Sequence, residues 1–175
     1  YVYRPPMSPL PGQASAAIGG RAFDLTAQVT RESGDDGVLF ASGTENSGIS
    51  VFVQNDRLLV DYNAFDEHTI LESDVDIPPG DSTLVVRLRR GEGMTGSMSM
   101  SINGVEAGSE ELGLFMRMMS SVGPSVGYDH GSPVSNRYAA PYPFAGQLHE
   151  VAIQLLSRRD LEARAAEATA EMSRQ

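Results

Sequence analysis

Glycine and proline occur so often in this chain that few segments are long enough for an extended helix. Eighteen glycines and ten prolines divide its 175 residues into short apolar runs, without the alternation of strands and long helices that predicts a parallel sheet. From Ala22 to Thr30, apolar side chains occupy every second position, as in a strand with one buried face. Further strands are predicted over residues 38–41, 49–54, 57–62, 69–73, 83–89, 97–103, 125–128 and 146–155.

These strands predict an all-β fold, a two-sheet antiparallel sandwich, because their centres lie about 9 to 15 residues apart. Asn103-Gly104 favours the positive φ angles of a tight hairpin turn, and residues 54–57 join two apolar runs in a similar way. Pro78 and Pro79 end a strand because neither can donate a ladder hydrogen bond. The stretch 104–124 has no clear period and predicts a loop with at most one short element.

The alternation also predicts which side chains fill the space between the sheets. We expect burial of Phe23, Leu25, Val51, Val53, Val60, Leu84, Val86, Ile102, Val151 and Ile153. Met98 and Met100 alternate with serines and are expected in the core as well. Three methionines in the unpatterned stretch are candidates for contact with a partner, because thioethers adapt to irregular surfaces: Met116, Met118 and Met119.

After Ser157 the chain changes to helix-forming residues without glycine or proline, and this predicts a C-terminal helix. Ser157 with Asp160 resembles a helix start signal. The apolar stripe of this helix is thin and rich in alanine, consisting of Leu161, Ala165, Ala168 and Met172. We therefore expect the helix to close an open sheet edge weakly or to lie in solvent, with docking on a neighbour as the alternative.

Charge and composition restrict the partners. The net charge of −10 opposes nucleic acid and anionic membranes, so we exclude both as main partners. The absence of cysteine excludes disulfides and thiolate chemistry but leaves the localisation open. Because the chain starts without an initiator methionine or a signal-peptide pattern, we expect a piece of a longer protein. Its expected parts are a linker or lead-in (1–20), the sandwich (21–156) and the helix (157–175).

Several catalytic motifs are incomplete, and we predict no catalytic residue. Glu72-Ser73-Asp74 begins the Glu-x-Asp-x-x-Glu strand of sandwich glycosidases, but Ile77 occupies the last position. Ser125 lies in a Gly-x-Ser-x-Gly sequence that no predicted helix follows. Residues 91–96 match a dinucleotide-binding glycine pattern, yet a strand follows, which favours a hairpin loop.

No metal site is predicted either. Glu72, Asp74 and Asp76 are expected to share one strand face as solvated carboxylates, with a calcium site as the alternative. The three histidines are too far apart in the sequence to suggest a zinc site. His149 shares the face of Val151 and Ile153, which predicts a hydrogen-bonded histidine at the margin of the core.

One loop collects groups that suit a sugar or another polar ligand. It carries a carboxylate, an imidazole and two phenol rings between glycines and prolines, at Asp129, His130, Tyr138 and Tyr142. The alternative is that Asp129 only binds its own loop backbone. Both interpretations stay open at this level.

Three strand motifs and one loop motif together resemble a known family. The strand motifs are Gly37-Val38-Leu39, Gly48 to Val53 led by Gly43, and Leu58 to Asn63. The loop motif is Asp129-His130-Gly131-Ser132-Pro133-Val134, followed by Tyr138 and Phe144-Ala145-Gly146. This combination resembles the C-terminal laminin-G or concanavalin-like domain of large bacterial arylsulfatases, and residues 3–11 resemble the linker that leaves the sulfatase core.

The resemblance implies a concanavalin-like jelly roll that packs on the sulfatase catalytic domain of the same chain and shapes its substrate entrance. The parent enzyme would use a formylglycine and a divalent metal, calcium or magnesium. The sulfatase motif Cys/Ser-x-Pro-Ser-Arg is absent here, and its nearest approach is Val122-Gly123-Pro124-Ser125-Val126. We therefore expect this fragment to be inactive by itself and to need no cofactor. The alternative function is an independent carbohydrate-binding module, with or without calcium, whose partner is a glycan.

Overall fold

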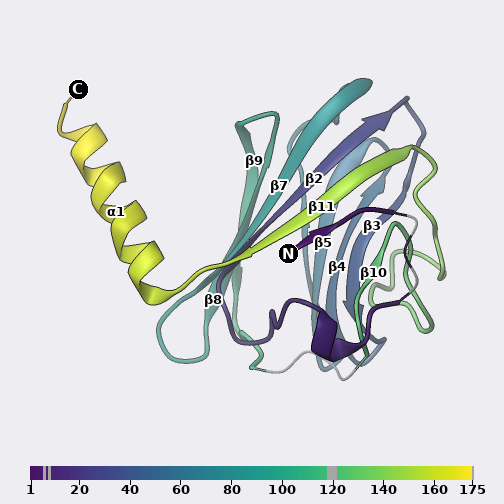
Figure 1. Cartoon of the computed structure of the whole chain (residues 1–175), viewed down its shortest axis with the longest axis horizontal. Helices are drawn as coiled ribbons and strands as arrows, with labels where there is room; N and C mark the ends of the chain where they lie inside the picture. Colours follow the sequence, from purple (N-terminus) through teal and green to yellow (C-terminus); the bar gives the residue numbers. More distant parts are fainter. Residues whose placement is uncertain (6, 8, 118–121, 175) are drawn as a thin grey trace.

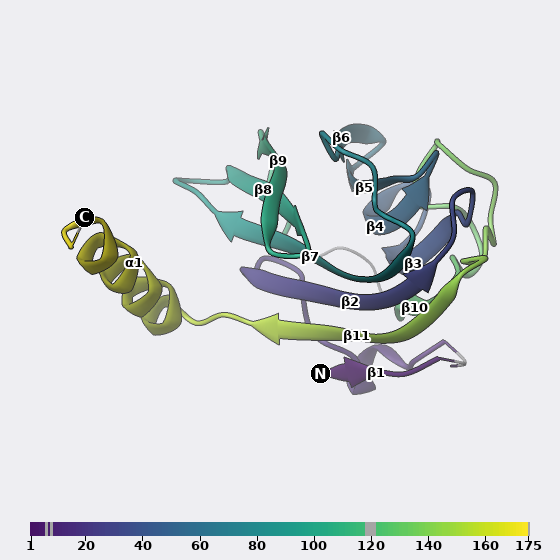
Figure 2. The ribbon, with the colours of Figure 1, turned by 90° about the horizontal axis from the view of Figure 1, so that it is seen from above.

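The computed structural model describes residues 1–5, 7, 9–117 and 122–174. Two antiparallel sheets face each other, and a helix follows the last strand (Figures 1 and 2). The six-stranded sheet has the order β1 (Val2–Tyr3), β11 (Gln147–Leu155), β2 (Phe23–Arg31), β7 (Gly80–Arg90), β8 (Gly96–Ile102) and β9 (Val105–Leu112). The five-stranded sheet has the order β10 (Ser125–Val126), β3 (Gly37–Gly43), β4 (Ser47–Gln54), β5 (Arg57–Ala64) and β6 (Glu67–Glu72). This architecture confirms the predicted sandwich.

The two predicted tight turns are present. Asn55 and Asp56 have φ angles of 52° and 64° between β4 and β5, and Asn103 and Gly104 have 52° and 82° between β8 and β9. Positive φ at both central positions is the geometry that suits the right-handed twist of a two-residue hairpin. Residues 91–95 form the predicted loop between β7 and β8.

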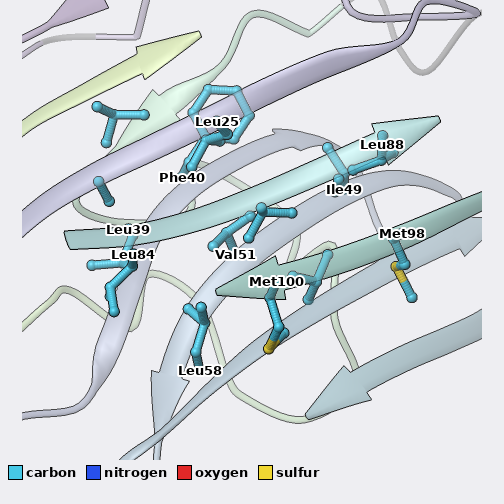
Figure 3. Packing of buried hydrophobic residues seen from close by; sticks show 14 of the residues in the cluster. Leu25, Leu39, Phe40, Ile49, Val51, Leu58, Leu84, Leu88, Met98 and Met100 are labelled. Carbon is cyan, nitrogen blue, oxygen red and sulfur yellow. The ribbon is translucent and has the colours of Figure 1, made fainter. Parts of the chain in front are cut away.

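The core lies between the two sheets, and Figure 3 shows side chains from both sheets meeting there. All ten side chains predicted to be inward are at most 5% exposed, and so are Met98 and Met100. The period of two along each strand explains this, since every second side chain faces the opposite sheet.

Two strands were not predicted. β9 lies in the stretch expected to be a loop with at most one short element. It is an edge strand whose glutamates and Gly108 hide the alternation. β1 pairs with β11 and buries Tyr3, whose hydroxyl accepts a hydrogen bond from the Ala16 N–H at 2.9 Å. Part of the expected lead-in therefore belongs to the sandwich, and it also buries Ile18.

Two expectations about individual side chains are wrong. His149 is exposed, because a β-bulge between Leu148 and Glu150 removes it from the inward register of β11. Met116 is 3% exposed and packs in the core, and its N–H donates to the Tyr62 hydroxyl at 2.8 Å. It cannot serve as a contact surface, while Met118 and Met119 lie outside the described residues.

The predicted helix is α1 (Arg158–Met172), and it begins with a full capping box between Ser157 and Asp160. None of its described residues is buried, and Figures 1 and 2 both show it projecting away from the sandwich. It does not cover a sheet edge. Its tie to the sheet is Arg164, which contacts Asp24 at 2.7 Å and Gln154 at 3.3 Å. Within the described residues, no helix is both long and apolar enough to cross a membrane.

Candidate functional site

The outer face of the five-stranded sheet is covered by the loop segment between β10 and β11. A second apolar cluster forms there, with Val38, Phe52 and Leu59 from the sheet and Val134 from the loop all buried. The loop comes close because Gly37 has no side chain: its φ is 129°, and a Cβ would lie 2.3 Å from the Pro143 carbonyl oxygen. This face is therefore part of the protein interior.

Asp129 anchors the covering loop. It is 1% exposed, and its Oδ2 accepts hydrogen bonds from the Val134 N–H at 2.9 Å and from the Tyr138 hydroxyl at 2.5 Å. Burial raises the pKa of Asp129, and the hydrogen bonds from Tyr138 and Val134 oppose that shift. The carboxylate is thus used within the loop, in agreement with the alternative that Asp129 binds its own backbone.

Of the other three predicted loop residues, Tyr138 and Tyr142 contact each other and His130 lies apart from this contact. The rings of Tyr138 and Tyr142 stack with centroids 5.0 Å apart, and Tyr138 also meets Phe52 edge to face. The Tyr138 hydroxyl lies 2.8 Å from Ser50 Oγ. His130 is exposed, and its backbone N–H donates to Ser125 Oγ at 3.0 Å. Asp129, Tyr138 and Tyr142 therefore come together beneath the loop, whereas His130 is exposed.

Two further polar groups on the covered face lack the geometry of a nucleophilic site. Asp61 is fully buried and contacts His68 Nδ1 at 2.8 Å, and Ser135 Oγ donates to the same carboxylate at 2.6 Å. In a Ser–His–Asp relay the serine would bond to the second imidazole nitrogen. Ser125 is also buried, in β10, and no helix follows it. Neither serine is placed for acyl transfer.

The acidic residues near Pro78 do not share a strand face. β6 ends at Glu72, Asp74 lies in the following loop, and Asp76 pairs with Arg57 at 3.2 Å. Among the described residues, no group of three or more histidine, aspartate or glutamate side chains is close enough to hold a metal ion.

The outer face of the six-stranded sheet differs from that of the five-stranded sheet, because its polar side chains remain accessible. Strand register aligns them in rows across β11, β2 and β7. One row is Gln154, Asp24 and Arg87, and the next is Ala152, Thr26 and Val85. A third row is Glu150, Gln28 and Thr83.

A first depression of about 720 Å³ lies over the first two rows. The short side chains of Thr26, Val85 and Ala152 form its floor, since longer groups flank them. Its walls include Tyr1, Arg87, Gln154 and, from α1, Arg164. Val2 aligns with Ala152 on this face and is 52% exposed, so it adds an accessible apolar surface.

Ion pairs hold the polar end of the first depression in place. The Asp24 carboxylate accepts hydrogen bonds from Arg89 and from Arg164, both at 2.7 Å. Burial alone would raise the pKa of Asp24, but these two hydrogen bonds outweigh it and hold the pKa below its ordinary value. Arg87 contacts Glu106 at 3.1 Å and Ser101 at 3.3 Å.

A second depression of about 340 Å³ lies further along the same face. The Thr30 hydroxyl donates to Asp81 and lies 2.7 Å from His149 Nε2. Since that hydroxyl has a single proton, His149 donates through Nε2. Thr83 donates to Gln28 Oε1 at 2.7 Å. The depression is thus lined by hydroxyl, amide, carboxylate and imidazole groups.

The residues of the two depressions were not predicted as a site. In the sequence of any single strand they are simply the polar, solvent-facing positions. The alternation of Asp24, Thr26 and Gln28 with apolar residues was visible in the sequence. Their alignment with Arg87 and Gln154 depends on pairing between strands that are far apart in the chain.

No protein-family model and no curated protein matches the chain. Among solved structures, the CBM40 of Ruminococcus gnavus IT-sialidase, bound to α2,3-sialyllactose, is 14% identical with a TM-score of 0.60, over 83% of this chain and 82% of that one. Mouse laminin α1 domains LG4-5 are 16% identical with a TM-score of 0.61, over 85% of this chain and 40% of that one. Galectin LEC-6 of Caenorhabditis elegans is 8% identical with a TM-score of 0.52, over 87% and 95%. The chain therefore has the laminin-G-like, concanavalin-like sandwich fold.

Proposed function

We propose that the domain binds a carbohydrate on the outer face of its six-stranded sheet, centred on the first depression. The observation that carries this proposal is the row of Gln154, Asp24 and Arg87 beside the exposed Val2 side chain. Amide, carboxylate and guanidinium groups can pair with sugar hydroxyls, and the apolar surface of Val2 and Ala152 can pack against the C–H face of a sugar.

The comparison with known structures supports the same function. The Ruminococcus gnavus CBM40 has this fold and was solved with α2,3-sialyllactose. Fold similarity does not transfer a ligand, so the proposal depends on the side chains of this chain's own depression. Asp129, Tyr138 and Tyr142 are outside that depression and serve to hold the loop.

Isothermal titration with 3′-sialyllactose and with lactose tests the proposal. Arg87→Gln should weaken binding of the preferred sugar at least tenfold, because it removes charged donors from the wall. Arg159→Gln removes the same charge from the exposed helix outside the depression and should leave affinity unchanged. Failure of both sugars to bind at millimolar concentration would contradict the proposal. Repeating the titration with calcium and with a chelator tests whether binding requires calcium.

A second proposal is an accessory role in a larger arylsulfatase, with the upstream catalytic domain as partner. The motifs that resemble the sulfatase C-terminal domain support it, and none of the three structures named above is a sulfatase. Within that enzyme, formylglycine and a calcium or magnesium ion would belong to the catalytic domain. Coding sequence upstream of Tyr1 that contains Cys/Ser-x-Pro-Ser-Arg would support this role, and turnover of an aryl sulfate by the fragment alone would contradict it.

A further inference from the structure

We infer that the ligand of the open face is an oligosaccharide that lies along β2 and β7, with a single acidic sugar in the first depression and neutral sugars in the second. This inference rests on the proposed function, because it assigns the class of carbohydrate that the site accepts. Its basis is the alignment of the two depressions and the difference in charge between them.

The two depressions follow one line on the sheet. β2 contributes Asp24 and Thr26 to the first and Gln28 and Thr30 to the second, all alternate residues of the same face. The antiparallel partner β7 contributes residues 85 and 87, and then 81 and 83. Six residue steps of about 3.3 Å separate Asp24 from Thr30, a span of about 20 Å that exceeds one sugar ring several times. A ligand that fills both depressions must therefore be an extended chain.

The first depression is suited to one negative charge. Arg87 and Arg164 line it, and their side chains are 29% and 42% exposed. Arg164 uses one N–H toward Asp24 and one toward Gln154, which leaves three of its five N–H donors for a ligand. Guanidinium groups with free donors match a carboxylate or sulfate in a planar, paired geometry.

The second depression contains no arginine or lysine among its described lining residues. Gln28, Thr83, Asn103 and His149 offer amide, hydroxyl and imidazole groups, and Asp81 adds a negative charge. These groups pair with neutral hydroxyls, while Asp81 repels a second anionic sugar. The net charge of −10 likewise opposes a polysaccharide that carries a negative charge on every sugar.

The decisive experiment compares three soluble glycans by isothermal titration. The first is 3′-sialyllactose, the second is a pentasaccharide with the same sialic acid on a neutral lacto-N-tetraose chain, and the third is that neutral tetrasaccharide. We expect the pentasaccharide to bind about tenfold tighter than sialyllactose, and the neutral tetrasaccharide to bind at least tenfold more weakly than the pentasaccharide.

Variants of the second depression test whether its residues cause the higher affinity for the pentasaccharide. Gln28→Ala and Thr30→Val should each remove most of the tenfold advantage of the pentasaccharide and leave sialyllactose affinity unchanged. Ser99→Ala is the control, because Ser99 lies beside Arg87 in the row across the sheet but lines neither depression. Unfolding midpoints within about 2 °C of the parent would show that these surface variants remain folded.

The outcomes separate this inference from the proposed function. Equal affinities for sialyllactose and the pentasaccharide, or losses in Gln28→Ala that are the same for both, would overturn the inference while leaving carbohydrate binding intact. Equal binding of the charged and neutral chains would also overturn it. Absence of binding by all three glycans would contradict the proposed function itself.

Discussion

The two outer faces of the sandwich are built from similar antiparallel strands but have different environments. On the five-stranded sheet, Phe52 and Leu59 point outward and are covered by the loop that contains Val134. On the six-stranded sheet, the outward positions of β2 are polar and stay accessible. An outward apolar side chain requires a cover, whereas an outward threonine or glutamine is already satisfied by water. The chemistry of the outward residues thus decides which face can meet a ligand.

This difference also explains why the most suggestive loop in the sequence is not the most accessible site. Asp129, Tyr138 and Tyr142 have the right groups for a sugar, but those groups bind each other, the loop backbone and the sheet. On the open face, the side chains of Arg87 and Arg164 stay partly accessible to solvent.

The largest expected effect is the loss of the loop anchor. Asp129→Ala leaves the Val134 N–H and the Tyr138 hydroxyl without their acceptor in a buried place, and should reduce the free energy of unfolding by about 3 kcal/mol. Urea denaturation measures this, and affinity for sialyllactose should stay unchanged. The exposed Asp74→Ala is the control. A loss below about 1 kcal/mol would mean that the loop does not depend on Asp129.

A smaller effect on the covered face is expected from one hydroxyl. Tyr138→Phe removes the donor to Asp129 and the contact with Ser50, and should cost about 1 to 1.5 kcal/mol. The matched control is Tyr142→Phe, because that hydroxyl lies 3.4 Å from the Val53 carbonyl and contributes little. Equal losses in the two variants would show that ring packing, not the hydrogen bond, holds the loop.

Removal of α1 should affect the open face far more in binding than in stability. Truncation after Ser157 should lower the free energy of unfolding by less than about 1 kcal/mol, because the helix buries none of its described residues and contributes mainly exposed pairs. Affinity for sialyllactose should fall at least fivefold through the loss of Arg164. Arg164→Gln in the full chain should cause a similar loss of affinity, because Arg164 makes the contacts between the helix and the sheet. A drop of several kcal/mol on truncation would contradict this account.

The smallest effect concerns pH, and its sign differs between the faces. The raised pKa of Asp129 stabilises the fold below the unfolded value of about 3.9, and that contribution is lost as pH rises through the folded pKa. The lowered pKa of Asp24 has the opposite effect: its contribution is present above about 3.9 and is lost as pH falls through the folded pKa.

Unfolding midpoints of the parent and of two asparagine variants between pH 3 and 7 check these signs. The advantage of the parent over Asp129→Asn should grow as pH falls, while its advantage over Asp24→Asn should shrink. Slopes of the same sign for both variants would show that the two carboxylates have similar environments.

The sequence by itself determined most of the strands, the two-sheet architecture and the start of the helix. The alternation in β2, the Asn103-Gly104 turn and the Ser157–Asp160 pair are local signals whose physical causes act within a few residues. The edge strand β9 was hidden because its exposed glutamates carry no periodic apolar signal, and the bulge at His149 changed the side of the strand that this residue faces.

Only the tertiary structure decided which polar residues are accessible. Asp129 is buried because residues at least 70 positions earlier, Phe52 on β4 and Leu59 on β5, present an apolar outer face that its loop covers. The candidate site exists because β11 and β7 flank β2 and align Gln154, Asp24 and Arg87. Such rows depend on pairing between distant strands, and the pattern within a single strand contains no information about which partner lies beside it.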